Sequence, residues 1–137
     1  MGAGMVLPSS GCAFISIKDA DKSPQTLEAA KTLVAQGFSI VATRGTAGWL
    51  SEQGVPCTTV NKVYEGRPNI VDMLKDGGVH LVINTTEGAQ AVEDSREIRA
   101  VALMDKIPYY TTAAAAQAAA LAIEAQAEGD LGVKSLQ

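Results

Sequence analysis

The sequence predicts an α/β domain built on a doubly wound, mainly parallel five-stranded sheet with helices on both faces. The chain has 137 residues, of which 47% are hydrophobic and 19% charged, so it has enough apolar material for one folded core. Short apolar runs alternate with helical patterns along its length. Chains in which strands and helices alternate usually fold into a parallel sheet whose strands are joined by right-handed helical crossovers. We therefore expect one domain across residues 1–137, with an ordered core over about 6–128.

Each element is expected from a local pattern. The apolar runs predict strands at 12–17, 38–42, 56–60, 80–83 and 107–110. A first helix is expected to begin with Ser23 as N-cap and Pro24 at the first position, and to stop at Gly37. Further helices are expected at 46–53, 68–75, 92–104 and 112–127, with Pro68 in the first turn of the third. The residues from Gly129 onward are expected to follow the last helix.

Composition argues against several classes of protein. Eleven basic and fifteen acidic residues give a net charge of −4, which disfavours nucleic-acid binding. The two cysteines, Cys12 and Cys57, and the single His80 form neither a disulfide framework nor a metal set. No apolar run reaches the roughly 20 residues that a membrane span needs. With no signal-peptide pattern at its start, the chain is expected to be cytoplasmic, with no membrane partner.

The strongest functional signal is an anion site where the second strand meets a helix. Thr43 and Thr46 flank Gly45 in this turn, where free backbone N–H groups and the helix dipole favour a phosphate. Lys22 and Lys62 follow the first and third strands, so they would reach the same edge of the sheet. The simpler alternative is that Thr46 only caps a helix and both lysines are solvated.

A second polar group, Asn84, Thr85 and Thr86, follows the fourth strand. These side chains would form hydrogen bonds with ribose hydroxyls or with the edge of a base. The simpler alternative is a turn, in which Asn and Thr are also common. We find no nucleophile beside a base, and a structural role is expected for His80. The sequence therefore predicts a binding site with no catalytic residue, metal or cofactor of its own.

Several segments resemble a known family. Residues 14–22, 36–38 and 42–47 are similar to the methylglyoxal-synthase-like superfamily. The run Asn61–Pro68, which reads Asn-Lys-Val-Tyr-Glu-Gly-Arg-Pro, is more specific. Together with 69–72, 82–86, 93–99 and 107–112, it resembles the C-terminal allosteric domain of the carbamoyl-phosphate synthase large subunit.

That resemblance implies a regulatory fragment of a much larger ligase. The parent would make carbamoyl phosphate from bicarbonate, glutamine-derived ammonia and ATP, with Mg or Mn, for pyrimidine and arginine biosynthesis. Its partners would be the synthetase domains of the same subunit, the glutaminase small subunit and further copies in an oligomer. The family's domain binds nucleotide monophosphates, UMP as inhibitor and IMP as activator in bacteria, and ornithine at a domain interface. The positions carried over are Lys22, Thr43, Thr46 and Lys62 for phosphate, Asn84, Thr85 and Thr86 for ribose and base, and Tyr109 and Thr111 for ornithine.

The sequence leaves two alternative functions open. A methylglyoxal synthase-type phosphate lyase needs a carboxylate base, and that family has an Asp after the Gly that corresponds to Gly66. Here Arg67 follows, and Asn84-Thr85 stands where that family has Asp-Pro, so the base is missing. The second alternative is an assembly module that binds no ligand.

Overall fold

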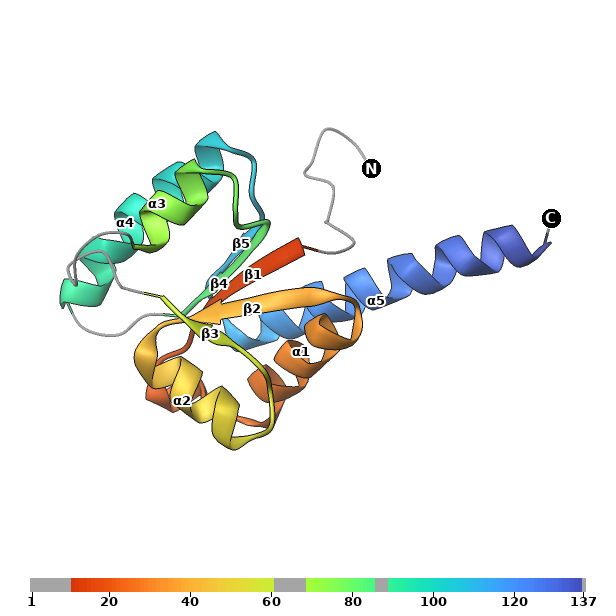
Figure 1. Ribbon diagram of the computed structural model, residues 1–137, viewed down its shortest axis with the longest axis horizontal. Helices are drawn as coiled ribbons and strands as arrows, with labels where there is room; N and C mark the ends of the chain where they lie inside the picture. The colour runs from red at the N-terminus through yellow and green to blue at the C-terminus, as the bar shows by residue number, and fades with distance from the viewer. Residues whose placement is uncertain (1–10, 61–68, 86–88, 137) are drawn as a thin grey trace.

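The computed structural model describes residues 11–60, 69–85 and 89–136, and it describes side chains for 11–60, 69–85 and 95–126. It contains five strands: β1 (Gly11–Ser16), β2 (Phe38–Ala42), β3 (Thr58–Thr59), β4 (Leu81–Asn84) and β5 (Tyr109–Tyr110). The helices are α1 (Pro24–Ala35), α2 (Arg44–Glu52), α3 (Ile70–Lys75), α4 (Ala89–Met104) and α5 (Ala113–Leu136), with a 3-10 turn, η1, at Asp19–Asp21. The alternation predicted from the sequence is thus confirmed (Figure 1).

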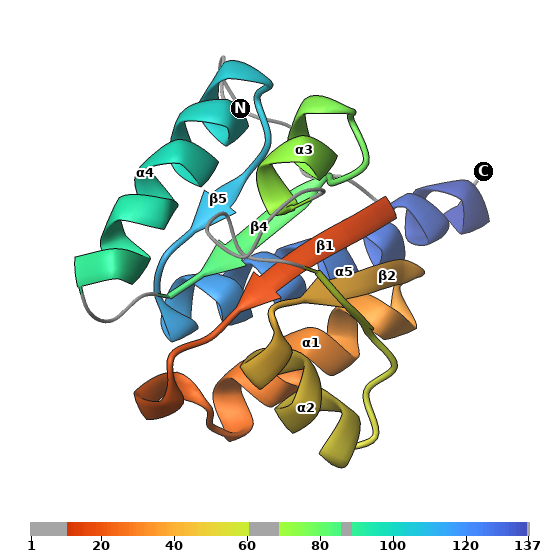
Figure 2. The same ribbon diagram turned by 60° about the vertical axis from the view of Figure 1, so that its left-hand side comes forward.

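All four strand pairings are parallel, and the strand order is β3-β2-β1-β4-β5. The chain leaves β1 toward β2 on one side and later returns to β4 on the other side, as Figure 2 shows. The order therefore reverses between β1 and β4. In open parallel sheets, the carboxyl ends of the strands at such a reversal form a crevice in which ligands bind.

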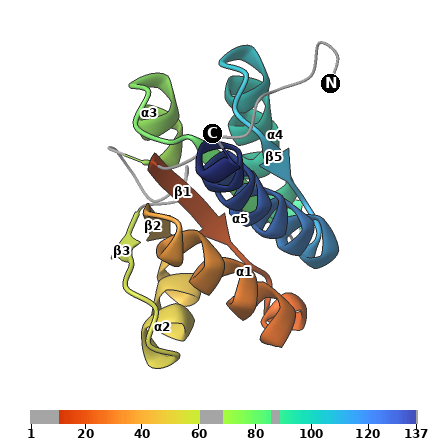
Figure 3. The same cartoon turned by 90° about the vertical axis from the view of Figure 1, so that its right-hand side faces the viewer.

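The side chains of each central strand alternate between two apolar cores. Ala13 and Ile15 of β1 face one cluster, which contains residues of α1, α2 and α5. Phe14, between them, faces a second cluster with α3 and α4. The helices therefore cover both faces of the sheet, as the view in Figure 3 shows. This confirms the doubly wound fold and fixes which strand ends share an edge.

Several element boundaries differ from the prediction. The first helix begins as expected, with Ser23 as N-cap and Pro24 as its first residue. The third begins at Ile70 rather than at 68, because the Asn69 side chain accepts hydrogen bonds from the amides of Val71 and Asp72 and so caps the helix there. Helix α5 does not stop at 127: it continues to Leu136 and extends past the sheet in Figure 1.

Among the described residues, no helix is long and apolar enough to cross a membrane. Nor do the described residues include a group of three or more His, Cys, Asp or Glu placed to hold a metal ion.

Candidate functional site

The hydroxyl groups of the predicted phosphate turn lie together at the carboxyl edge of the sheet. Thr43 is the N-cap of α2, and its Oγ1 lies 3.4 Å from Oγ1 of Thr46. Both side chains are buried, with 4% and 1% of their surface exposed. Because the Thr43 hydroxyl makes no capping bond, it leaves the first-turn amides of α2 without a side-chain partner from that residue.

Ser16, at the end of β1, adds a third hydroxyl that the sequence prediction did not include. Its Oγ lies 3.2 Å from Oγ1 of Thr43, a residue 27 positions away. The apolar run 12–17 places Ser16 inside a strand, and only the parallel pairing of β1 with β2 brings it beside Thr43. A polar residue at the carboxyl end of a central strand is the signal that was available in the sequence.

Thr46 does more than occupy the first turn of a helix. Its Oγ1 accepts a hydrogen bond from the backbone amide of Ile17 at 2.9 Å and donates to the carbonyl of the same residue at 3.4 Å. The cap of α2 is Thr43 rather than Thr46, and the role of Thr46 in binding a phosphate stays a prediction. The side chain joins the start of α2 to the segment that leaves β1, so it shapes the turn in which an anion would sit.

The Lys22 ammonium group lies over this turn. Its Nζ is 3.8 Å from the position that a Cβ atom would occupy on Gly45. The same Nζ donates to Oδ1 of Asp19 at 2.8 Å. That hydrogen bond, reinforced by the charge of Lys22, lowers the pKa of Asp19 below its usual value. The Lys22 side chain is half-buried, and its ion pair with Asp19 holds it beside the first turn of α2. A contact of Lys22 with phosphate stays a prediction.

Thr85 and Asn84 are buried, each with 3% of its surface exposed, and both are hydrogen-bonded within the protein. Thr85 Oγ1 accepts from the backbone amide of Lys18 at 2.9 Å, which fastens the exits of β1 and β4 across the reversal of strand order. Asn84 Nδ2 donates to Ser95 Oγ at 2.9 Å and to Tyr109 Oη at 3.0 Å. A contact of these side chains with ribose or base stays a prediction.

The remaining predicted residues are less closely tied to the turn. Tyr109 is half-buried, and its hydroxyl accepts the hydrogen bond from Asn84. Thr111 directly follows β5 and is exposed. Lys62 and Thr86 lie outside the described residues. The structure therefore brings Thr43, Thr46 and Lys22 together, with Ser16 as an addition, and it connects Asn84 to Tyr109 as a separate pair.

His80 has the structural role expected from the sequence. Its Nδ1 accepts a hydrogen bond from the amide of Cys12 at 3.0 Å, and its own amide donates to the Cys12 carbonyl at 2.8 Å. Burial raises the pKa of the Cys12 thiol, which keeps it in the less nucleophilic protonated form. This pair lies at the amino end of β1, on the opposite edge of the sheet from Thr43.

The comparisons with known proteins agree with this fold. A family model described as the MGS-like domain matches residues 25–111. The chain belongs to the MGS-like domain family. It is 50% identical over all of its 137 residues to the carbamoyl phosphate synthase large chain of Rhizobium meliloti. It is 47% identical over the same length to the protein of that name from Brucella suis, and 49% identical to the one from Myxococcus xanthus.

These relatives are much longer proteins. The chain spans 12% of the length of the Rhizobium and Brucella proteins and 13% of the Myxococcus protein. The MGS-like domain is therefore similar to one part of a carbamoyl phosphate synthase large chain. This agrees with the resemblance of the sequence motifs.

Proposed function

We propose that this chain is the regulatory domain of a carbamoyl phosphate synthase large chain, and that it binds nucleotide monophosphates through their phosphate group. The observation that carries the proposal is the Lys22 ammonium beside the first turn of α2, next to the buried hydroxyls of Thr43 and Thr46. A phosphate dianion needs several donors and positive charge in one place. The first-turn amides and Lys22 would supply both, and the hydroxyls of Ser16 and Thr43 could turn toward the ligand as further donors, whereas Thr46 donates to the Ile17 carbonyl and shapes the turn.

The site is suited to binding rather than to proton transfer. A phosphate lyase of the methylglyoxal synthase type needs a carboxylate held toward the substrate. The carboxylates that the structure describes next to the turn are Asp19 and Asp21, and each is paired with a lysine, at 2.8 Å from Lys22 and 3.9 Å from Lys18. Asp19 is also 93% exposed, so it is poorly placed to act as a base in a closed site.

Regulation would follow from the place of this domain in a longer polypeptide. The synthesis of carbamoyl phosphate from bicarbonate, ATP and ammonia would then belong to other parts of that polypeptide and to a glutaminase partner. A nucleotide changes that activity only if it binds more tightly to one arrangement of the domains than to another. The difference in binding free energy that such regulation needs is about 1–3 kcal/mol.

Calorimetric titration tests the proposal directly. UMP and IMP are titrated into the protein, with ornithine as a further ligand and dihydroxyacetone phosphate as the substrate of the competing enzyme. We expect a nucleotide to bind, and Lys22→Ala to weaken it by about tenfold or more, because it removes a charged hydrogen-bond donor. Lys31→Ala is the matched control, since Lys31 is an exposed lysine on α1.

Three outcomes decide between the functions. Weaker binding in Lys22→Ala and in Lys62→Ala, with unchanged binding in Lys31→Ala, supports the phosphate site. Turnover of dihydroxyacetone phosphate would establish the lyase instead. Failure of every ligand to bind, both to this chain and to the full-length polypeptide, would favour an assembly module.

A further inference from the structure

The segment that carries Lys22 leaves the carboxyl edge of the sheet as a short strap. This strap, residues 18–22, connects β1 to α1 and contains the 3-10 turn η1. No residue of η1 is buried, so apolar packing contributes little to holding the strap against the rest of the protein. Its position therefore depends on polar contacts.

Buried threonines from three different elements form hydrogen bonds with the backbone in and next to the strap. Thr85, which follows β4, accepts from the amide of Lys18 at 2.9 Å. Thr26 of α1 donates to the carbonyl of Asp21 at 2.7 Å. Thr46 of α2 holds the residue before the strap, as described above. All three threonines are at most 4% exposed, so hydroxyls inside the protein hold the backbone at both ends of the strap.

Ion pairs inside the strap shape it but do not fix its place. Two ion pairs lie within it, and the shorter one joins Lys22 Nζ to Asp19 Oδ1 at 2.8 Å. Both partners of each pair belong to the strap, so the pairs would move together with it. The bonds from Thr26 and Thr85 connect the strap to α1 and to the end of β4 instead. These two hydroxyls therefore fix the place of the strap relative to the sheet.

The place of the strap decides what the Lys22 ammonium group can reach. Its Nζ lies 3.8 Å from the position of a Cβ on Gly45, and 20% of the side chain is exposed. The lysine side chain is a flexible four-carbon stem, so a fixed backbone is needed to aim its charge. Groups that bind a ligand have to be held within about 0.5 Å of the productive geometry. A released strap would therefore weaken any contact that Lys22 makes with an anion.

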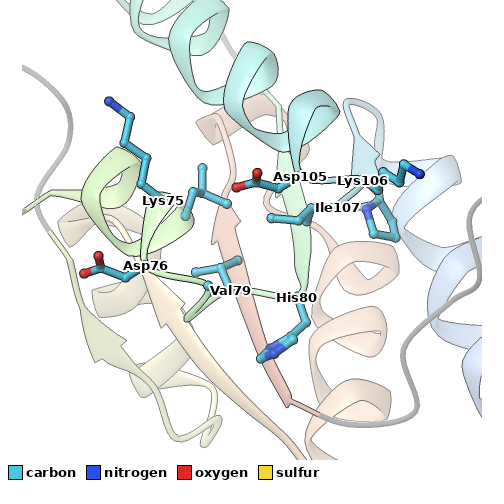
Figure 4. A pocket seen from close by; sticks show the side chains of 10 residues that line it. Lys75, Asp76, Val79, His80, Asp105, Lys106 and Ile107 are labelled. Atoms are coloured by element: carbon cyan, nitrogen blue, oxygen red, sulfur yellow. The ribbon is translucent and has the colours of Figure 1, made fainter.

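Lysines at the other edge of the sheet are arranged differently. Lys75 and Lys106 line a hollow with a volume of about 580 Å³ at the amino ends of β4 and β5. Both are exposed, and Figure 4 shows their ammonium groups pointing away from each other. Asp76 and Asp105, in the same lining, are also exposed, so the hollow presents charges of both signs. It does not gather its lysines around one point, whereas the strap holds Lys22 beside one turn.

From these observations, we infer that Thr85 is a positioning residue of the nucleotide site, which acts on the ligand through the strap and Lys22 rather than by direct contact. Its hydroxyl is buried and already accepts the Lys18 amide. Its own amide donates to the carbonyl of Ser16 at 2.9 Å, so Thr85 connects the end of β1 and the strap to β4. The inference rests on the proposed function, because the place of Lys22 matters to a nucleotide only if one binds there. It replaces the ribose or base contact that the sequence predicts for Thr85.

Hydrogen exchange tests whether Thr85 holds the strap, and it needs no ligand. Thr85→Val keeps the volume of the side chain but removes the hydroxyl. We expect the amides of Asp21 and Lys22, which form the hydrogen bonds within the strap, to exchange about fivefold faster, because one anchoring bond is lost. Thr112→Val is the matched control, since Thr112 accepts the amide of Ala115 outside the strap. Unchanged exchange in Thr85→Val, or equal acceleration in the control, would overturn the inference.

Two further variants separate the hydroxyl from the shape of the side chain. Thr85→Ser keeps the hydroxyl and should exchange as the parent protein does. Thr85→Ala lacks it and should exchange as the valine variant does, so it provides the same comparison if valine disturbs folding. Fast exchange in Thr85→Ser would assign the effect to the methyl group and overturn the inference.

Calorimetry with UMP or IMP then tests whether Thr85 acts through Lys22. We expect Thr85→Val to weaken nucleotide binding about fivefold in the parent protein. In a Lys22→Ala background, the same change should weaken it by less than about 1.5-fold, because the group through which Thr85 acts is gone. Equal losses in both backgrounds would mean that Thr85 contacts the nucleotide directly, which overturns the inference.

The inference and the proposed function fail in different ways. If Lys22→Ala leaves the affinity unchanged, or if no nucleotide binds to the parent protein, the proposed function is wrong, and hydrogen exchange still decides whether Thr85 holds the strap. If Lys22→Ala weakens binding and Thr85→Val does not, the proposed function stands and the role inferred for Thr85 is wrong.

Discussion

The hydroxyl of Thr46 accepts a hydrogen bond from the backbone amide of Ile17 at 2.9 Å, between residues 29 positions apart. This contact joins the exit of β1 to the first turn of α2, so two neighbouring strand ends share one rigid edge. The hydroxyls of Thr43 and Ser16 continue the same network. The proposed phosphate turn is therefore shaped by bonds between chain segments before any ligand arrives.

Thr46→Val should destabilise the protein without changing its shape. Valine has nearly the same volume but leaves the Ile17 amide without its buried acceptor, which costs about 1–3 kcal/mol in the free energy of unfolding. Urea denaturation measures the loss. Thr58→Val, at an exposed position in β3, is the control and should change stability by less than about 0.5 kcal/mol. Equal stability of the two variants would mean that the Ile17 amide has another partner.

The Tyr109 hydroxyl should contribute to stability, whereas that of its neighbour should not. Tyr109→Phe removes an acceptor of the buried Asn84 amide, so it should cost about 1–2 kcal/mol. Tyr110→Phe is the matched control, because the Tyr110 hydroxyl makes no hydrogen bond to any residue that the structure describes. Burial raises the pKa of Tyr110. Thermal and urea unfolding of both variants test this. A larger loss in Tyr110→Phe would contradict it.

Gly11→Ala should destabilise the amino edge of the sheet. The residue has φ +133°, and the added methyl would lie 2.5 Å from His80 Nδ1, so we expect a loss of about 2 kcal/mol or more. Gly48→Ala is the matched control, since a Cβ there meets nothing within 4 Å. Within helix α2, that change should stabilise by about 0.5–1 kcal/mol. Differential scanning calorimetry should therefore show shifts of opposite sign.

Asp19→Asn should tighten the binding of a nucleotide monophosphate. If phosphate binds at Lys22 as proposed, the Asp19 carboxylate would compete with it for the Lys22 ammonium. The lowered pKa of Asp19 keeps this carboxylate ionised until the pH falls below its usual value of 3.8. Asp21→Asn makes the same change of net charge in the same turn, but Asp21 pairs with Lys18 instead.

By calorimetry at low salt, we expect Asp19→Asn to bind about threefold more tightly than Asp21→Asn. The difference should shrink as salt is added, because Asp19 is 93% exposed. Weaker binding in Asp19→Asn would show instead that the carboxylate holds Lys22 in place for the ligand.

Patterns within short segments were sufficient to predict the elements. The run 38–42 matches β2 residue for residue, and Ser23 with Pro24 correctly marks the start of α1. These signals are local, because a strand or a helix start depends on neighbouring side chains and on the fixed φ of proline. The predicted start of α3, at residue 68, was wrong. The side chain of Asn69 caps the helix, which therefore begins at Ile70.

By itself, the sequence determined a parallel α/β domain and placed Lys22, Thr43 and Thr46 in the segments that follow the first two strands, since apolar periodicity and turn residues are encoded locally. Only the tertiary structure decided that Ser16 lies against Thr43, and that Asn84 is bound to Ser95 and Tyr109. Those contacts join segments that are distant in the chain, and their geometry depends on strand order and register. Strand order and register are properties of the assembled sheet, so neither can be derived from the pattern of a short segment.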